Sequence, residues 1–210
     1  MVYIGQTRSR ALIAELTELG FGEITQRHEV PPRRMPWALD NGAFGDWRAE
    51  RPFDAAQFRK ALADARSVAT RPDFVAVPDR VAAGLDSLSL SLEWRDECAE
   101  LTQPYLVVQD GMTSSDVSAV IDRFGGLFVG GSLSWKIATG SSWVELAHKH
   151  SKRCHIGRVG TPRRVAWSKR IGADSIDSCL PLWSRDMLAD FVAAVRGTGR
   201  QAELFFGGKW

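Results

Sequence analysis

The sequence predicts an α/β chain that closes into a compact (β/α)8 barrel of the TIM type. Short, wholly apolar segments such as residues 74–77 and 105–108 are typical of strands buried on both faces of a parallel sheet. Segments with helical spacing of apolar residues alternate with these strands, and such alternation favours a parallel arrangement. No linker or change of composition divides the 210 residues, so we expect a single domain over residues 1–210.

The expected strands are short, and most end at a glycine or a polar residue. A chain of 210 residues is shorter than the roughly 250 typical of this barrel, so its helices and loops must be trimmed or a strand must be missing. An open doubly wound sheet is the alternative, but residues 5–7 are not the glycine-rich phosphate loop that such a fold needs to bind a dinucleotide. The expected strands are residues 2–4, 21–26, 37–39, 74–77, 105–108, 127–129, 154–156 and 175–177.

Helical spacing and capping residues predict the helices between the strands. Ser114 or Ser115 can cap one helix, Ser142 another, and Thr161 a third that has Pro162 in its first turn. The expected helices are residues 8–19, 53–69, 86–101, 115–124, 142–150, 162–171 and 185–195.

Composition excludes several classes of protein. The chain is 44% hydrophobic and 25% charged with a net charge of +2, so any contact with nucleic acid needs a local cationic patch. The three cysteines are far apart, which predicts neither a disulfide framework nor a zinc site and fits a cytoplasmic location. No segment reaches 18 apolar residues and the N-terminus lacks a signal-peptide pattern, so we expect no membrane partner.

Polar residues follow strand after strand, and a barrel gathers the carboxyl ends of its strands on one face. Two carboxylates can divide nucleophilic and acid/base roles at a glycosidic bond, and an aspartate with a glutamine can read the edge of a nucleobase. Taken singly, each residue has an ordinary alternative as a turn or helix-cap residue, and three aspartates could also bind a metal, although their spacing matches no ligand motif. The strand-end residues are Asp40, Asp79, Gln109, Gly130, Gly131, Arg158 and Asp177.

The histidines are expected to be solvated or structural, with one exception. His155 lies on a predicted strand and is the histidine to test. The others are His28, His148 and His150.

The strand ends resemble those of the tRNA-guanine transglycosylases, and more closely those of their short relatives that insert 7-deazaguanine bases into DNA. The order and spacing of the matching segments make the resemblance specific, and it covers roughly residues 37–181. The segments are Leu-Asp-Asn-Gly-Ala-Phe at 39–44, Val-Pro-Asp at 77–79, Val-Val-Gln-Asp-Gly at 107–111, Gly-Gly-Leu-Phe-Val-Gly at 125–130, Val-Gly-Thr-Pro at 159–162 and Ala-Asp-Ser-Ile-Asp-Ser-Cys-Leu-Pro at 173–181.

The resemblance implies a role for each matching residue. Asp177 would be the covalent nucleophile and Asp40 the general acid/base. Asp79 and Gln109 would hydrogen-bond the pyrimidine edge of the base. The remaining base-binding residues would be Gly126 and Leu127, through their backbone, and Phe44, through stacking.

Departures from the family pattern narrow the expected substrate. The tRNA enzymes of the family have a zinc module with clustered cysteines and a histidine. This module is absent here, so we expect no metal and no cofactor. Gly131 stands where the tRNA enzymes have a glutamate that suits an aminomethyl base, which favours a nitrile-bearing 7-deazaguanine of the preQ0 type. Residues 182–183 are Leu-Trp in place of a Thr-Arg pair that contacts tRNA, which favours DNA as the partner, with tRNA as the alternative.

Binding of a nucleic acid would need cationic side chains that contact its phosphate backbone. Arg158, Lys136, Arg163 and Arg164 are the expected contacts, although any one of them can instead be part of a solvated helix face. Further candidates are Arg33, Arg34, Lys169 and Arg170. A hydrolytic glycosidase with the same carboxylates and a non-catalytic nucleic-acid-binding barrel remain alternatives, and the oligomeric state stays open, as does the role of residues 205–210.

Overall fold

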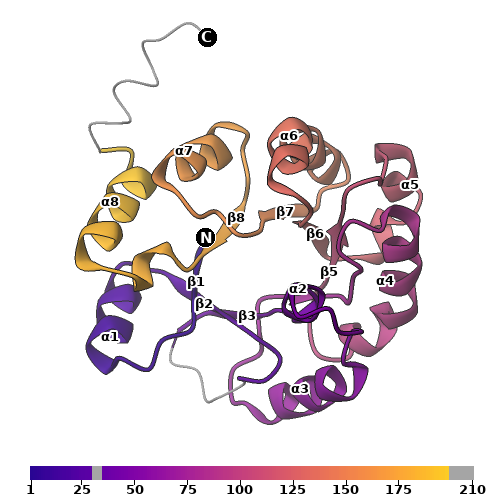
Figure 1. Cartoon of the computed structure of the whole chain (residues 1–210), viewed down its shortest axis with the longest axis horizontal. Helices are drawn as coiled ribbons and strands as arrows, with labels where there is room; N and C mark the ends of the chain where they lie inside the picture. The colour runs from indigo at the N-terminus through magenta and orange to yellow at the C-terminus, as the bar shows by residue number, and fades with distance from the viewer. Residues whose placement is uncertain (30–34, 199–210) are drawn as a thin grey trace, which may run out of the picture.

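The structure, a computed structural model, describes residues 1–29 and 35–198, which form a closed barrel of eight parallel strands (Figure 1). Each strand pairs with the next, and β8 closes the barrel on β1, where Asp177 lies opposite Tyr3. The predicted (β/α)8 barrel is therefore confirmed. The strands are β1 (Val2–Gly5), β2 (Gly22–Thr25), β3 (Trp37–Leu39), β4 (Val75–Ala76), β5 (Pro104–Val108), β6 (Gly126–Val129), β7 (Arg153–Ile156) and β8 (Ser175–Ser178).

The helices surround the barrel, with the exception of α2, which lies inside their ring and over the strands (Figure 1). The chain closes a full barrel by trimming elements, since β4 has two residues and α5 has five. The helices are α1 (Arg10–Glu18), α2 (Ala43–Arg48), α3 (Ala55–Ser67), α4 (Gly84–Ala99), α5 (Ser114–Ser118), α6 (Leu133–Lys149), α7 (Pro162–Arg170) and α8 (Arg185–Arg196), with 3-10 turns at Ile121–Arg123 and Leu180–Leu182.

Two helix predictions were wrong in their details, and one helix was missed. The helix expected to begin after Ser142 begins at Leu133, and Ser132 caps it. Gly140 does not interrupt this helix, and a Cβ there would lie 2.8 Å from the ring of Trp167, so close packing explains the glycine. The cap of α5 is Thr113, within a capping box, and α2 was not predicted at all. The Thr161 cap and first-turn Pro162 of α7 are confirmed.

Two apolar layers form the core. Side chains alternate between the two sides of each strand, so one set fills the barrel and the other packs beneath the helices. Trp37, Leu106 and Leu127 belong to the layer beneath the helices. The barrel filling consists of Tyr3, Ile24, Ala38, Phe74, Ala76, Tyr105, Val107 and Phe128. This filling blocks the lower barrel and leaves its upper end, at the carboxyl ends of the strands, to polar side chains.

No helix in residues 1–29 and 35–198 combines the length and apolarity needed to cross a membrane.

Candidate active site

Polar side chains form the layer directly above the apolar filling. Asp40 lies two residues beyond Ala38, and Gln109 lies two residues beyond Val107, so each continues the inward-facing side of its strand. Asp177 likewise faces inward near the end of β8. We call this end of the barrel the mouth, and define it by Asp40, Asp79, Gln109, Gly131, Arg158 and Asp177. The strand-end side chains that the sequence predicts to converge do lie together at this mouth.

Asp177 is buried, at 7% exposure, and one of its carboxylate oxygens is firmly held. Oδ1 lies 2.9 Å from Nε2 of His155 and accepts the backbone N–H of Arg158 at 3.0 Å. The backbone carbonyl of Asp177 accepts the N–H of Val159 at 2.8 Å. Among the described residues, no hydrogen bond reaches Oδ2. This carboxylate is therefore oriented, with one oxygen left for another partner.

Asp40 has an environment different from that of Asp177. Its Oδ2 accepts a hydrogen bond of 2.8 Å from Nε2 of Gln26, a residue of the loop after β2 that the sequence did not single out. Burial, and then the charge of Asp177, raise the pKa of Asp40 to about 6, against opposing hydrogen bonds from Gln26 and from the backbone of Gly42 and Asn41. A carboxyl with this pKa can take up and release a proton near neutral pH.

Asp79 and Gln109 are joined to each other at the mouth. Asp79 accepts Nε2 of Gln109 at 2.6 Å and Nδ2 of Asn41 at 2.7 Å, and it is 5% exposed. Burial raises the pKa of Asp79 to about 6, and the charge of Asp40 adds to this effect. Asn41 also donates to the carbonyl of Val77. Asn41 is part of the family-like segment 39–44, but it was assigned no role from the sequence. Its amide directly after the strand-end carboxylate of Asp40 was a signal that could have identified it as a site residue.

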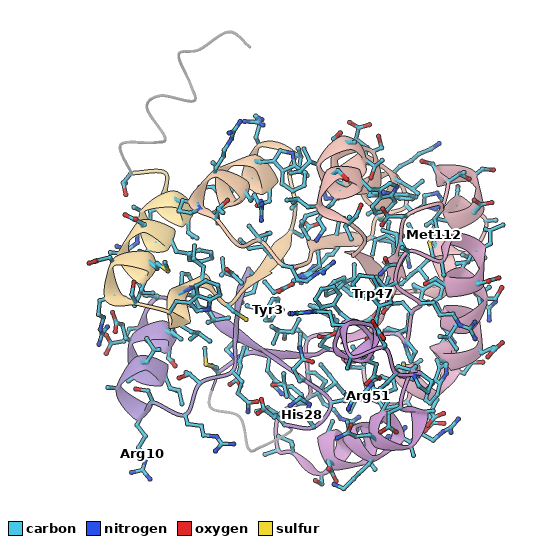
Figure 2. The ribbon with its side chains drawn as sticks, viewed as in Figure 1. Tyr3, Arg10, His28, Trp47, Arg51 and Met112 are labelled. Atoms are coloured by element: carbon cyan, nitrogen blue, oxygen red, sulfur yellow. The ribbon has the colours of Figure 1, made fainter. Side chains whose placement is uncertain are left out.

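A stack of three side chains also borders the mouth. The guanidinium carbon of Arg158 lies 3.9 Å from the ring centroid of Phe44, and the Phe44 and Trp47 rings stack at 5.7 Å. Arg158 has a φ of +57° and donates through Nη2 to the carbonyl of Gly131 at 2.6 Å. Trp47, labelled in Figure 2, is 54% exposed. A base can therefore stack on this side of Phe44 only after the guanidinium moves, or it can stack on the guanidinium itself.

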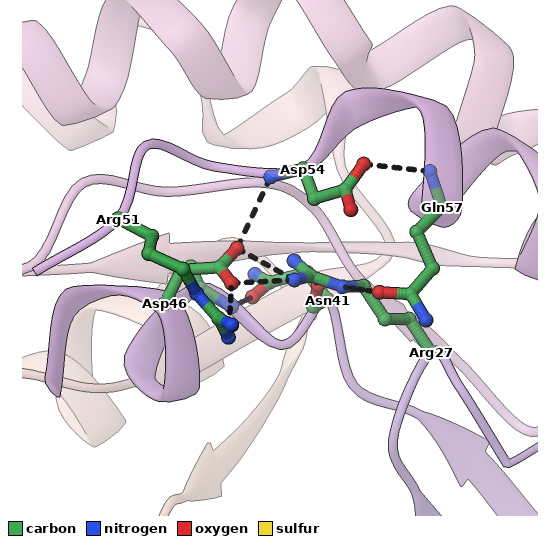
Figure 3. Close-up of polar contacts among 7 residues, drawn as sticks. Arg27, Asn41, Asp46, Arg51, Asp54 and Gln57 are labelled. Atoms are coloured by element: carbon green, nitrogen blue, oxygen red, sulfur yellow. Dashed lines mark hydrogen bonds and ion pairs between the residues drawn. The ribbon is translucent and has the colours of Figure 1, made fainter. Parts of the chain in front are cut away.

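A buried ion pair holds α2, the helix that carries Phe44 and Trp47, in place (Figure 3). Nη2 of Arg27 lies 2.6 Å from a carboxylate oxygen of Asp46, and both side chains are buried. Arg27 also donates to the carbonyl of Asn41 and to Oε1 of Gln57, and the N–H of Asp54 donates to Asp46. The network ties the loop after β2 and the start of α3 to α2, so it fixes the segment that carries Asp40 and Phe44.

The expected base contacts of Gly126 and Leu127 were wrong. Both residues lie at the start of β6, at the end of the barrel away from the mouth, where Gly126 is opposite Arg153. Leu127 is fully buried in the core beneath the helices. Gly126 is needed there because a Cβ would lie 2.6 Å from the Tyr105 ring.

The glycines that reach the mouth are the pair after β6. A Cβ at Gly130 would lie 2.7 Å from Nε2 of Gln109, and one at Gly131 would lie 2.5 Å from Oδ2 of Asp110. Asp110 in turn accepts the N–H of Ser132 at 2.7 Å, which ties the start of α6 to the loop after β5. The backbone wall of the mouth is therefore Gly130 and Gly131.

The expected phosphate-binding cations have different surroundings. Lys136 is 4% exposed and its ammonium donates to the carbonyl of Gly157, so it is not available as a surface cation in this conformation. Burial lowers its pKa to about 7. Arg158 and Arg163 are exposed, and Arg164 is half-buried on α7. Lys169 donates to the carbonyl of Val195, and Arg170 is exposed. Arg33, Arg34 and residues 205–210 lie outside the described residues.

Three cysteines are free, and one of them borders the mouth. Cys179, directly beyond β8, is exposed as a residue, but partial burial of its thiol raises its pKa, and the nearby charges of Asp177 and Asp40 add to this effect. Among residues 1–29 and 35–198, no cluster of three or more His, Cys, Asp or Glu side chains is arranged to hold a metal ion.

Comparison with known proteins found no protein-family model and no curated protein that matches the chain.

Proposed function

We propose that this protein is a base-exchange transglycosylase that replaces guanine in DNA with a 7-deazaguanine of the preQ0 type. The observation that carries the proposal is the pair of carboxylates in unlike environments. Asp177 is oriented through Oδ1, while Oδ2 has no hydrogen bond from the residues that the structure describes, and Asp40 has a pKa of about 6. Two carboxyl groups whose surroundings set them apart can serve as nucleophile and as acid/base.

The reaction proceeds in two displacements at the sugar C1′. Asp177 attacks C1′, the bond from C1′ to the guanine nitrogen breaks, and Asp40 gives its proton to the departing guanine. A 7-deazaguanine then enters, Asp40 takes a proton from its ring nitrogen, and that nitrogen attacks C1′ while Asp177 leaves as a carboxylate. Each displacement inverts C1′, so the configuration is retained. One glycosidic bond replaces another, and the exchange needs no energy source.

The mouth supplies groups suited to a purine-like base. Asp79, Gln109 and Asn41 offer a buried carboxylate and two amides, which can hydrogen-bond a pyrimidine edge after their mutual contacts rearrange. Gly130 and Gly131 let the side chains of Gln109 and Asp110 pack directly against the backbone at this edge of the mouth. Because the carboxylates lie at the barrel mouth, the target nucleotide must be single-stranded or flipped out of the duplex.

The choice of DNA rests on the surface near the mouth. Trp183 ends the 3-10 turn Leu180–Leu182 that follows β8 and is 72% exposed, where the resembling tRNA enzymes carry a Thr-Arg pair at 182–183. Exposed cations on α7, Arg163 among them, are suited to phosphates, and binding should weaken steeply as salt rises. Free thiols at all three cysteines fit a cytoplasmic location for this activity.

Intact-protein mass spectrometry tests the proposal. The protein is incubated with a guanine-containing DNA oligonucleotide and, separately, with a tRNA anticodon stem-loop. We expect an adduct with DNA that is absent in Asp177→Asn. The control variant Asp186→Asn, which loses an exposed carboxylate on α8, should still form it. An adduct with RNA alone would overturn the choice of polymer. Release of free guanine without incorporation of preQ0 would establish hydrolysis instead of exchange. The absence of both an adduct and guanine release would refute the proposed chemistry.

A further inference from the structure

His155 lies inside the barrel and bridges two side chains of the neighbouring strand. It is on β7, opposite Ser175 of β8, and is fully buried at 0% exposure. Its Nδ1 lies 2.9 Å from Oγ of Ser175, and its Nε2 lies 2.9 Å from Oδ1 of Asp177. Ser175 and Asp177 are two residues apart and face the same side of their strand, so one imidazole ring spans both.

The surroundings of His155 determine where its proton lies. The rings of Phe128, Phe74 and Tyr3 lie 4.5, 5.2 and 5.9 Å from the imidazole. Burial among them lowers the pKa of His155, so the ring is neutral at neutral pH. An ionised carboxylate can only accept a hydrogen bond, so Nε2 carries the proton and donates it to Asp177. Nδ1 then accepts the hydroxyl proton of Ser175.

The three residues do not form a hydrolytic serine triad. Ser175 is the deeper of the two β8 residues, since Asp177 is nearer the carboxyl end of the strand, and its hydroxyl is used in the contact with Nδ1. A nucleophilic serine needs access to substrate, whereas here the carboxylate is the member at the mouth. The direction of the chain of hydrogen bonds, from Ser175 through His155 to Asp177, points its donors at the carboxylate.

We propose that His155 is a positioning residue that, together with the backbone N–H of Arg158, fixes Oδ1 of Asp177 and so makes Oδ2 the oxygen that attacks the sugar. This inference rests on the proposed function. When Oδ2 bonds to C1′, Oδ1 becomes the carbonyl oxygen of the resulting ester and keeps both donors. When the incoming nitrogen displaces the ester, the C1′–Oδ2 electron pair returns to the carboxylate. The charge that develops on Oδ1 is stabilised by two N–H groups already in place.

The experiment compares two amides at position 155. The amide nitrogen of glutamine can reach the place of Nε2 and donate to Asp177, whereas that of asparagine reaches only the place of Nδ1. We expect His155→Gln to retain kcat within about 5-fold, and His155→Asn to lose about 10²- to 10³-fold in kcat, the usual cost of one such donor. KM for preQ0 should stay within about 2-fold in both, because neither variant touches the base contacts of Asp79 and Gln109.

Thermal unfolding of both variants, with binding of free preQ0, shows whether each is folded. If either fails to fold, the hydrogen positions are read in the wild-type protein by ¹⁵N NMR, where we expect a neutral imidazole protonated on Nε2. Wild-type kcat in a folded His155→Asn, an equal loss of kcat in both folded variants, or an imidazole protonated on Nδ1 alone would overturn the positioning role. Absence of exchange and adduct in the wild-type protein would instead refute the proposed function, and with it this inference.

Discussion

Replacing Asp40 with Asn should make the protein more stable while removing its proposed acid/base group. The pKa of Asp40 is raised from its ordinary 3.8 to about 6. A difference of this size corresponds to about 3 kcal/mol at about 1.4 kcal/mol per pKa unit. Water at the half-buried side chain screens part of that, and rotation of the Gln26 amide lets its Oε1 accept from the new Nδ2 while Oδ1 still faces the backbone N–H groups, so we expect a gain of roughly 1–2 kcal/mol. For a chain of this length the melting temperature should rise by roughly 2–8 °C.

The sign and the pH range follow from proton binding. A carboxyl whose pKa is raised in the folded state binds its proton more tightly there than in the unfolded chain. Its ionisation therefore opposes folding above about pH 6, and the penalty is absent once pH falls below the ordinary value of 3.8. The stability difference between Asp40→Asn and wild type should be full at pH 7.5 and small at pH 4.

Urea denaturation at these two pH values is the assay, with Asp186→Asn as the control for loss of an exposed carboxylate. Asp79→Asn is a second comparison, since Asp79 has a similar pKa of about 6. It should not be stabilising, because Asn cannot present two acceptor oxygens to the amides of Asn41 and Gln109. If Asp40→Asn gains no stability at pH 7.5, or gains as much at pH 4, the reasoning from buried charge is wrong.

Four further substitutions, one of them a control, test the geometry of the mouth. Gly131→Ala should lower the free energy of unfolding by about 1–3 kcal/mol, since its φ is +71° and a Cβ would meet Asp110; Gly45→Ala, where a Cβ meets nothing within 4 Å, should raise it by about 0.5–1 kcal/mol. Urea denaturation measures both free energies of unfolding, and equal changes in Gly131→Ala and Gly45→Ala would contradict the structure. Leu127→Ala should cost about 2–5 kcal/mol and leave KM for preQ0 unchanged, and an increased KM in folded protein would restore Leu127 to the base pocket. Phe44→Ala should raise KM roughly 5- to 150-fold, from about 1–3 kcal/mol of base stacking, and an unchanged KM would remove Phe44 from the site.

The barrel could be predicted because its signals are local. Runs such as Tyr105–Leu106–Val107–Val108 are apolar without interruption, which requires burial on both faces, and helices with their own caps separate them. The strand-end positions of Asp40 and Gln109 followed from the same local pattern, because a polar residue directly after a buried strand falls at the barrel rim.

Glycine pairs on both sides of β6 show where local pattern was insufficient. Residues 125–126 and 130–131 are both Gly-Gly, and a resemblance in sequence assigned the base contacts to Gly126 of the first pair and to Leu127. The direction of the strand in the closed barrel puts Gly126 at the far end, against the Tyr105 ring, and brings Gly131 to the mouth. Sequence spacing records a distance along the chain and not which end of the barrel a residue reaches.

Contacts between distant segments were decided only by tertiary structure. The sequence marked His155 as a histidine on a strand, but its bridge from Ser175 to Asp177 depends on the pairing of β7 with β8. The Arg27–Asp46 pair that anchors α2 likewise joins residues from separate elements. Hydrophobic periodicity encodes which face of an element is buried, whereas hydrogen bonds and ion pairs across the barrel exist only once closure of the barrel has brought their partners together.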